Sequence, residues 1–368
     1  MFEKRIENTI RLINNHHIDA LALNAGTDLM YFTGLQFHLS ERPVVLILSP
    51  GLTPILIYPE FETEKVKNAE MLFSTFPYSE DISSWGLAFS NATKKIILKN
   101  NTIGVNPTSM RYLELNFLEK SINANFVSAA EIIKEMRIIK DIREIQSIRK
   151  AVKVAEVAFT KMVPEIKIGK TEKEIANELS INLLLAGSEP EFPFMPIIAS
   201  GPNSSNPHAV PSDRKIEAGD LIVIDWGARA EGYISDITRT LSVGEPDPEF
   251  NKIAKIVKKA NETARLNSYS DFTSNNVDQL IRDIIKAEGY GDYFIHRSGH
   301  GIGLEPHEEP YIQENNNLPL EPGMVFTIEP GIYLPGKGGV RIEDNVLITG
   351  DGIETLTSLP RELRILKT

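Results

Sequence analysis

Apolar residues in the first third of the chain alternate between short continuous runs and helical spacing. The short runs have the length of buried strands and lie at 19–23, 44–49 and 54–58. Apolar residues at helical spacing occur at 3–15, 60–69 and 108–119. This alternation predicts a small α/β unit.

The pattern changes near residue 128. Residues 128–160 are charged and nearly free of glycine and proline, which predicts a connecting helix followed by the first helix of a second unit. After residue 190, strand-like segments lie at 220–242, 294–304 and 323–348, and helical patterns lie at 247–267 and 273–287. A β-rich core flanked by helices is an α+β domain. We therefore predict an N-terminal α/β domain at 1–125, a linker helix at 126–138 and an α+β domain at 139–368.

The composition narrows the range of partners and chemistries. The chain has 368 residues and a formal net charge of −11, so it lacks the excess of Lys and Arg that nucleic-acid binding requires. It contains no cysteine, which excludes disulfides, cysteine zinc sites, iron–sulfur clusters and a thiol nucleophile. The N-terminal segment lacks the apolar core of a secretory signal, and no run approaches the ~20 apolar residues that cross a bilayer. We expect a cytoplasmic protein that binds neither nucleic acid nor membranes.

Two aspartates fall in a predicted hairpin over residues 221–240. Asp225 lies on an apolar strand, and Asp236 lies on the strand that returns. A turn centred between Ala230 and Glu231 would place the two carboxylates directly opposite each other, with Cβ atoms ~4.5–5.5 Å apart. Opposed like charges destabilise a hairpin unless something neutralises them, and a divalent metal ion does so.

A second predicted hairpin, over residues 324–346, repeats this arrangement with glutamates. Pairing Glu329 with Glu343 places the turn at Gly336, inside the sequence PGKGG. Arg341 lies two residues before Glu343, so its side chain points to the same face of the strand. Each acid taken alone is more often a turn or cap residue than a ligand, but two symmetric pairs together with a glycine-flanked histidine indicate a metal site.

A histidine between glycines supplies a metal ligand of a different type. His300 is flanked by Gly299 and Gly301, and glycine lets a backbone approach a ligand closely. Four carboxylates and one imidazole form an oxygen-rich donor set that suits Mn²⁺ or Co²⁺, can hold Zn²⁺ or Fe²⁺, and does not suit Cu⁺. The charges of two divalent ions match those of four carboxylates, so the spacing predicts a dinuclear site.

These residues and their surroundings resemble the pita-bread metallopeptidase family, and within it the proline-specific branch. The family's ligand order Asp, Asp, His, Glu, Glu is matched at intervals of 11, 64, 29 and 14 residues by Asp225, Asp236, His300, Glu329 and Glu343. The strings SDITRT, GHGIGLEPHEEP, EPGIY and GVRIED carry the resemblance, and NAGTDLMYFTGL extends it to a creatinase-like N-terminal domain. The resemblance implies a C-terminal pita-bread domain, two divalent metal ions and a homodimer.

The resemblance also implies roles for individual residues. Glu329 resembles the general base, which takes a proton from the attacking water and passes it to the leaving imide nitrogen. His208 resembles a histidine that contacts the substrate near the scissile bond, and His307 resembles one that stabilises the tetrahedral intermediate. Arg341 resembles an arginine that organises the site, and His296 resembles a histidine beside the proline pocket.

Structural alternatives stay open for several of these residues. A single histidine is more often a hydrogen-bonded core or surface residue than a catalyst. Arg341 could simply pair with Asp344 or another acid. Three aromatic residues could pack against the proline ring or belong to the core: Phe192, Phe194 and Tyr311.

The polar tract 37–43 holds His38, Glu41 and Arg42. In the branch that the chain resembles, the N-terminal domain of a partner subunit can lean over the active site. The tract is therefore a candidate for limiting substrate length, with His38 as a substrate-binding residue.

The expected reaction is metal-dependent hydrolysis of the peptide bond before proline. Chain length and ligand spacing favour Xaa-Pro dipeptides as substrates. The alternatives are an Xaa-Pro aminopeptidase that acts on longer peptides, a metal-dependent hydrolase of another ester or amide, and a non-catalytic binding module of the same fold.

Overall fold

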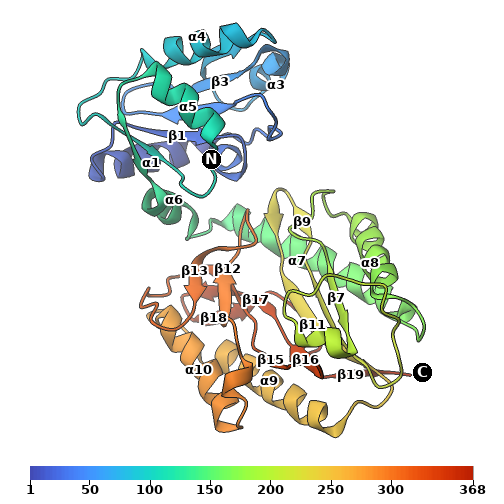
Figure 1. Cartoon of the computed structure of the whole chain (residues 1–368). Helices are drawn as coiled ribbons and strands as arrows, with labels where there is room; N and C mark the ends of the chain where they lie inside the picture. Colours follow the sequence, from blue (N-terminus) through green and yellow to red (C-terminus); the bar gives the residue numbers. More distant parts are fainter. Residues whose placement is uncertain (368) are drawn as a thin grey trace. The chain divides into compact units, whose positions relative to one another are not determined.

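The computed structural model describes residues 1–367, which divide into two compact units, residues 1–137 and residues 138 onward (Figure 1). The predicted two-domain organisation with mixed α and β content is confirmed, and the finer boundaries at 126 and 139 stay predictions. Among the described helices, none combines the length and the apolar character needed to span a membrane.

The first unit is built on a six-stranded mixed sheet with the order β4-β3-β2-β1-β5-β6. The strands are β1 (Ala20–Asn24), β2 (Val45–Leu48), β3 (Ile55–Pro59), β4 (Ser74–Tyr78), β5 (Thr102–Val105) and β6 (Asn125–Ser128). The helices are α1 (Phe2–Asn15), α2 (Thr27–Thr33), α3 (Thr63–Lys67), α4 (Ile82–Thr93), α5 (Tyr112–Ser121) and α6 (Ala130–Arg137). Every residue of β1, β2 and β3 is buried, which is why these strands read as continuous apolar runs in the sequence.

Four long helices belong to the second unit. They are α7 (Ile142–Met162), α8 (Glu172–Ala186), α9 (Pro248–Asn267) and α10 (Ser274–Ala287). The helix α7 begins at a capping box formed by Asp141 and Glu144, and it stacks Phe159 on Trp226 with ring centroids 4.4 Å apart. This contact fixes α7 against the strand that carries Asp225. The predicted α9 and α10 are confirmed, and no pattern predicted α8.

The strands of the second unit form two main sheets and two short ribbons. The sheets have the orders β19-β11-β8-β7 and β13-β12-β14-β17-β18, and the ribbons pair β9 with β10 and β15 with β16. The bounds are β7 (Ile197–Ser200), β8 (Leu221–Trp226), β9 (Arg229–Ala230), β10 (Tyr233–Ile234), β11 (Ile237–Val243), β12 (Gly299–Gly301), β13 (Glu308–Ile312), β14 (Val325–Ile328), β15 (Gly331–Leu334), β16 (Gly338–Arg341), β17 (Asp344–Thr349), β18 (Gly352–Thr355) and β19 (Arg364–Leu366).

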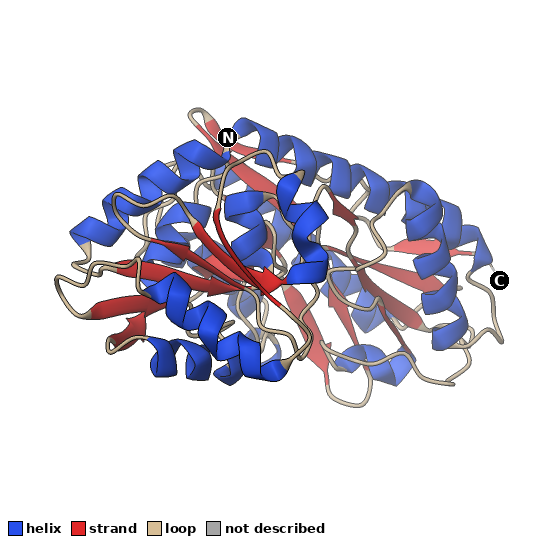
Figure 2. Cartoon of the chain, turned by 90° about the horizontal axis from the view of Figure 1, so that it is seen from above, coloured by secondary structure: helices blue, strands red, loops and turns tan. Residues whose placement is uncertain are grey.

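The two main sheets meet at a single bridge between Thr238 and Glu343. In Figure 1, α7 and α8 accompany β7 and β11, and α9 and α10 accompany the second sheet. Figure 2 shows the chain from above, with its helices in blue and its strands in red. Glu343, the acid at this bridge, is buried.

Candidate metal centre

The second unit contains a cavity of about 680 Å³. All five predicted metal ligands and four further predicted site residues line it: Asp225, Asp236, His300, Glu329, Glu343, His208, His296, His307 and Arg341. Folding therefore gathers side chains that are spread between positions 208 and 343 of the chain.

The first hairpin is formed in a register that differs from the predicted one. Asp225 pairs with Thr238, so the prediction that it directly faces Asp236 was wrong. The turn falls at Glu231 and Gly232, whose φ angles of 54° and 79° are typical of a two-residue hairpin turn. Because the pairing is displaced by an even number of residues, both aspartates stay on one face, as diagonal neighbours.

The second hairpin has the predicted register. The β14–β17 ladder and the β15–β16 ladder share one alignment, and Glu329 and Glu343 fall opposite each other between them. The turn residue Gly336 has a φ of 71°, at the predicted centre. Thr238 donates a hydrogen bond from Oγ1 to Glu343 Oε2 at 2.7 Å, which joins this hairpin to the first one.

His300 lies in the middle of β12, where the flanking glycines are required by backbone packing. A Cβ atom on Gly299 would lie 1.9 Å from the carbonyl oxygen of Thr327. A Cβ atom on Gly301 would lie 2.2 Å from the carbonyl oxygen of Glu309. The glycines were expected to serve a close approach to a ligand, and in the structure they permit a close approach of neighbouring strands.

The imidazole of His300 faces three carboxylates. Its Nε2 atom lies 3.6 Å from Glu329 Oε1, 3.7 Å from Asp236 Oδ2 and 4.0 Å from Glu343 Oε1. Ligand atoms of Asp236, His300 and Glu343 all lie within 4.8 Å of one another. Three buried carboxylate oxygens of the described chain have no hydrogen-bond partner: Asp225 Oδ1, Asp236 Oδ1 and Glu343 Oε1. Unpaired buried carboxylate oxygens are costly, so these residues fit divalent cations as the missing partners.

Burial changes the protonation of the whole cluster. Burial and the neighbouring carboxylates raise the pKa values of Asp236 and Glu343 well above their usual range. Burial raises the pKa of Glu329 to about 8, although the positive charge of Arg341 opposes the change. Burial also lowers the pKa of His300 well below its usual value, so the imidazole is neutral, as metal binding requires.

Arg341 connects one acid to a residue that the sequence analysis missed, Tyr333. Arg341 donates from Nη2 to Asp225 Oδ2 at 2.7 Å and from Nη1 to the Tyr333 hydroxyl oxygen at 2.8 Å. His296 Nδ1 donates to the carbonyl oxygen of Arg297 at 2.7 Å, so its Nε2 atom accepts from the Tyr333 hydroxyl at 2.9 Å. Burial raises the pKa of Tyr333 to about 12 and lowers that of His296 to about 3, so both side chains are neutral.

A periodicity argument could have found Tyr333. It lies four residues after Glu329, so in an extended strand it points to the same face. The alternative that Arg341 pairs with Asp344 is not realised, because Arg341 binds Asp225.

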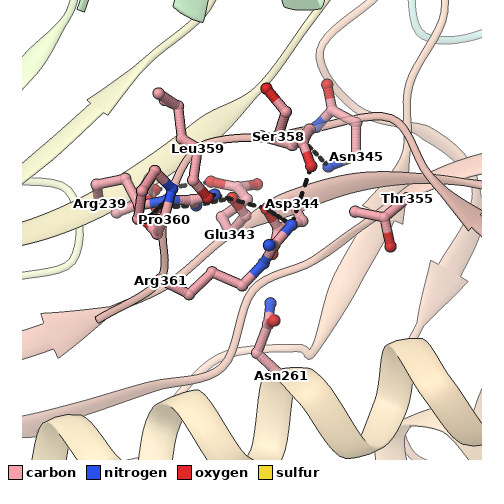
Figure 3. A network of polar contacts seen from close by, with 12 residues as sticks. Arg239, Asn261, Glu343, Asp344, Asn345, Thr355, Ser358, Leu359, Pro360 and Arg361 are labelled. Atoms are coloured by element: carbon pink, nitrogen blue, oxygen red, sulfur yellow. Dashed lines mark hydrogen bonds and ion pairs between the residues drawn. The ribbon is translucent and has the colours of Figure 1, made fainter. Parts of the chain in front are cut away.

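A second polar network surrounds Asp344, the residue that follows Glu343 in the chain (Figure 3). The fully buried Asp344 accepts hydrogen bonds from Arg239 Nη2 and Arg361 Nε, each at 2.7 Å. Arg239 also donates from Nη1 to the carbonyl oxygens of Thr238 at 2.9 Å and Glu343 at 2.7 Å. Arg239, on β11, thus binds the backbone of Glu343, where the two main sheets meet.

His208 lies on a loop that a buried glutamate fastens at both ends. Glu172, in the first turn of α8, accepts hydrogen bonds from the backbone N–H and hydroxyl of Ser200 at 2.7 and 2.8 Å. It accepts the same pair of bonds from Ser212 at 2.9 and 2.6 Å, and Asn203 Nδ2 reaches both oxygens at 3.1 Å. No sequence pattern marks Glu172, because its partners are 28 to 40 positions away.

The remaining predicted residues differ in their placement. The ring of His307 lies edge-on to that of His300, with centroids 4.4 Å apart, and burial and the charge of Arg297 lower its pKa. Of the three aromatic residues considered for the proline ring, Phe194 lines the cavity. His38 is exposed and belongs to the first unit, so its role stays a prediction.

Two family models match the chain. The model of metallopeptidase family M24 matches residues 146–350, and the model of the creatinase/prolidase N-terminal domain matches residues 5–139. These matches confirm the predicted fold class, a creatinase-like N-terminal domain followed by an α+β pita-bread domain.

Individual relatives are similar over nearly their whole length. An Xaa-Pro dipeptidase of Pyrococcus furiosus is 40% identical over 98% of this chain and 99% of its own. The structure of a prolidase from Thermococcus sibiricus is 36% identical, covers 100% of this chain and 99% of its own, and has a TM-score of 0.94. The structure of an X-Pro aminopeptidase from Thermotoga maritima is 35% identical, covers 98% and 99%, and has a TM-score of 0.86.

Proposed function

Since the chain belongs to metallopeptidase family M24, we propose that it is an Xaa-Pro dipeptidase, which hydrolyses the bond between a first residue and proline. The observation that carries this proposal is that four carboxylates and His300 line one cavity, and that three buried oxygens of these carboxylates have no hydrogen-bond partner. The similarity to an Xaa-Pro dipeptidase and to a prolidase supports the choice of substrate.

We propose that two divalent ions bind at the five residues of this group: Asp225, Asp236, His300, Glu329 and Glu343. The oxygen-rich donor set favours Mn²⁺ or Co²⁺ and also accommodates Zn²⁺ or Fe²⁺. Ions bound there supply Lewis acidity, which polarises the scissile carbonyl group and makes a water molecule more acidic. Metal analysis after dialysis against a chelator and reconstitution measures the number and identity of the ions.

Residues of the chain are proposed to transfer the proton of the attacking water and to stabilise the negative charge that develops on the substrate oxygen. Glu329 suits the role of general base, because a buried carboxyl with a raised pKa accepts and returns a proton near neutral pH. His307 presents a neutral imidazole on the cavity wall, where it can donate to the oxygen of the tetrahedral intermediate. His208 and His296 line the same cavity and are proposed to contact the substrate, with His296 beside the proline ring. A proline amide has no N–H group, so catalysis by carbonyl polarisation suits it.

The test is a hydrolysis assay on metal-stripped protein and after addition of Mn²⁺, Co²⁺ or Zn²⁺ separately. The substrates are Leu-Pro and the tripeptide Leu-Pro-Gly. Metal-dependent cleavage of the dipeptide is expected, and Glu329→Gln should lower kcat by at least ~10³-fold. The exposed Glu321→Gln is the matched control and should retain activity. Absence of cleavage with every metal, in protein shown to bind two ions, would contradict proline specificity.

A second candidate function is an Xaa-Pro aminopeptidase, since the Thermotoga maritima X-Pro aminopeptidase is similar over 98% of this chain. Faster cleavage of Leu-Pro-Gly than of Leu-Pro would favour this reading. Cleavage of unrelated esters or amides at a comparable rate would instead indicate a hydrolase of broader specificity.

We propose, finally, a cytoplasmic homodimer in which the tract 37–43 limits substrate length, with His38 as a substrate contact. The resemblance to the proline-specific branch and the exposure of His38 support this proposal. Light scattering after size-exclusion chromatography measures the oligomeric state. Neutralising residues 37–42 should relax the preference for short substrates, and an unchanged preference would contradict the proposed role.

A further inference from the structure

A buried ion pair lies next to His307 and has no part in the proposed reaction. Lys140 Nζ lies 2.6 Å from Glu308 Oε1, and the two side chains are 1% and 9% exposed. Glu308 directly follows His307 in the chain. Removing two charges from water costs free energy that their mutual attraction does not always offset. Stability alone therefore does not explain the pair.

The lysine of this pair is fixed through its backbone. The Lys140 N–H group donates to the carbonyl oxygen of Gly323 at 2.9 Å, in the turn that precedes β14. The Gly323 N–H group donates to the carbonyl oxygen of Ile348, on β17, also at 2.9 Å. The residue after the lysine, Asp141, caps the N-terminus of α7. The ammonium group of Lys140 therefore extends from a segment that is held by the second main sheet and by α7.

The glutamate of this pair closes the loop that contains His307. Glu308 pairs with Gly301, so the loop 302–307 begins and ends at these two residues. Its carboxylate lies against Gly303 within the loop, where an added Cβ atom would lie 2.5 Å from Glu308 Oε1. The same oxygen binds the lysine. The two ends of the loop and the lysine are thus joined through one carboxylate.

We propose that the Lys140–Glu308 pair positions the His307 imidazole for the oxygen of the tetrahedral intermediate, so that both members of the pair are positioning residues. This inference rests on the proposed function. The ring of His307 lies on a loop and contacts the ring of His300 edge-on. A shift of about 1 Å in a group that contacts the reacting atoms can lower the rate about 100-fold. The pair limits such a shift, because Glu308 is joined to His307 by one peptide bond and its carboxylate is fixed at Lys140.

Variants of the Mn²⁺-loaded enzyme, assayed with Leu-Pro, test this role. Glu308→Gln should lower kcat by about 10- to 100-fold, change KM less than about threefold and leave the content of bound metal unchanged. The double variant Lys140→Met/Glu308→Gln leaves no buried charge unpaired and should show a similar loss of kcat. A normal kcat in the double variant would show that the pair only balances charge, and the inference would be wrong. Glu362→Gln is the matched control, because it breaks the exposed pair of Lys258 and Glu362, which does not line the cavity, and it should leave kcat unchanged.

A double-mutant cycle with His307 separates positioning from a general effect on the fold. In the His307→Ala background, Glu308→Gln should lower kcat less than about threefold, because the imidazole that the pair positions is absent. Losses that multiply, as they do for independent sites, would contradict the inference.

A crystal structure of the double variant Lys140→Met/Glu308→Gln does not depend on turnover. The ring of His307 should move by more than about 1 Å from its contact with His300, and an unchanged ring position would overturn the role of the pair. Failure of the unaltered enzyme to cleave any Xaa-Pro substrate would instead overturn the proposed function, and the position of the ring would still decide whether the pair orients His307.

Discussion

Removing the metal ions should leave a protein whose stability falls as the pH rises from 7 to 9. Burial raises the pKa of Glu329 to about 8, from an ordinary value of 4.5 for a glutamate in the unfolded chain. Between these values the folded protein binds a proton that the unfolded chain has lost, so a rise in pH favours unfolding. Buried Asp236 and Glu343, whose pKa values are also raised, act in the same direction.

The expected size of the effect follows from the pKa of Glu329. Between pH 7 and 9 the Glu329 carboxyl group is protonated about half of the time on average. The unfolding free energy should therefore fall by about 1.4 kcal/mol over this range. His296 and His300, whose pKa values are lowered, act in the opposite direction at lower pH. Below pH 6.5 the unfolded chain gains protons on these histidines that the folded protein does not bind, which partly offsets the effect of the three acids and flattens the slope.

The assay is urea unfolding of chelator-treated protein at pH 7 and pH 9, followed by tryptophan fluorescence. The chain has two tryptophans, Trp85 in the first unit and Trp226 in the second. In the variant Trp85→Phe, fluorescence comes from Trp226 and therefore follows unfolding of the unit that holds the candidate metal centre. Glu329→Gln should reduce the slope without removing it, because Asp236 and Glu343 remain. Addition of Mn²⁺ should raise the stability at pH 7. An unfolding free energy that is constant or rises between pH 7 and 9 in the metal-free protein would refute the reasoning.

Three further predictions concern residues around the ligands. Glu172→Gln should destabilise the protein by about 3 kcal/mol in urea unfolding, because an amide cannot accept all the hydrogen bonds that the buried carboxylate accepts. These hydrogen bonds lower the pKa of Glu172 although burial opposes them, so the carboxylate stabilises the fold above pH 4.5 and loses this effect as the pH falls further. Asp344→Asn should cost about 3–5 kcal/mol, because it leaves buried arginine charge uncompensated, whereas the exposed Asp351→Asn should cost less than about 0.5 kcal/mol. Tyr333→Phe should lower kcat about 10-fold with little loss of bound metal, and Tyr293→Phe on the surface should leave kcat unchanged; a normal rate in Tyr333→Phe would show that the hydroxyl bridge is dispensable.

Local patterns were sufficient for several elements of the fold. The strands β1, β2 and β3 were predicted because strands buried on both faces are continuous runs of apolar residues. The helices α9 and α10 were predicted because a helix buried on one face has apolar residues at helical spacing. The register of the second hairpin was also predicted, since its turn at Gly336 is built by adjacent glycines. The first hairpin was predicted in the wrong register because its turn lies one residue later, at Glu231 and Gly232, where the backbone adopts positive φ.

Residues whose hydrogen-bond partners are distant in the sequence could not be predicted from local patterns. Tyr333, Glu172 and Arg239 carry ordinary sequence contexts, and their partners lie on other strands or loops.

The sequence by itself determined which candidate ligand residues are present, in which order, and within which hairpins, because side-chain chemistry and strand alternation are local properties. The tertiary structure alone decided that these acids are buried, that three of their oxygens lack partners, and that their pKa values are raised. Desolvation and hydrogen-bond satisfaction depend on segments brought together from distant parts of the chain, and no local pattern records which segments these are.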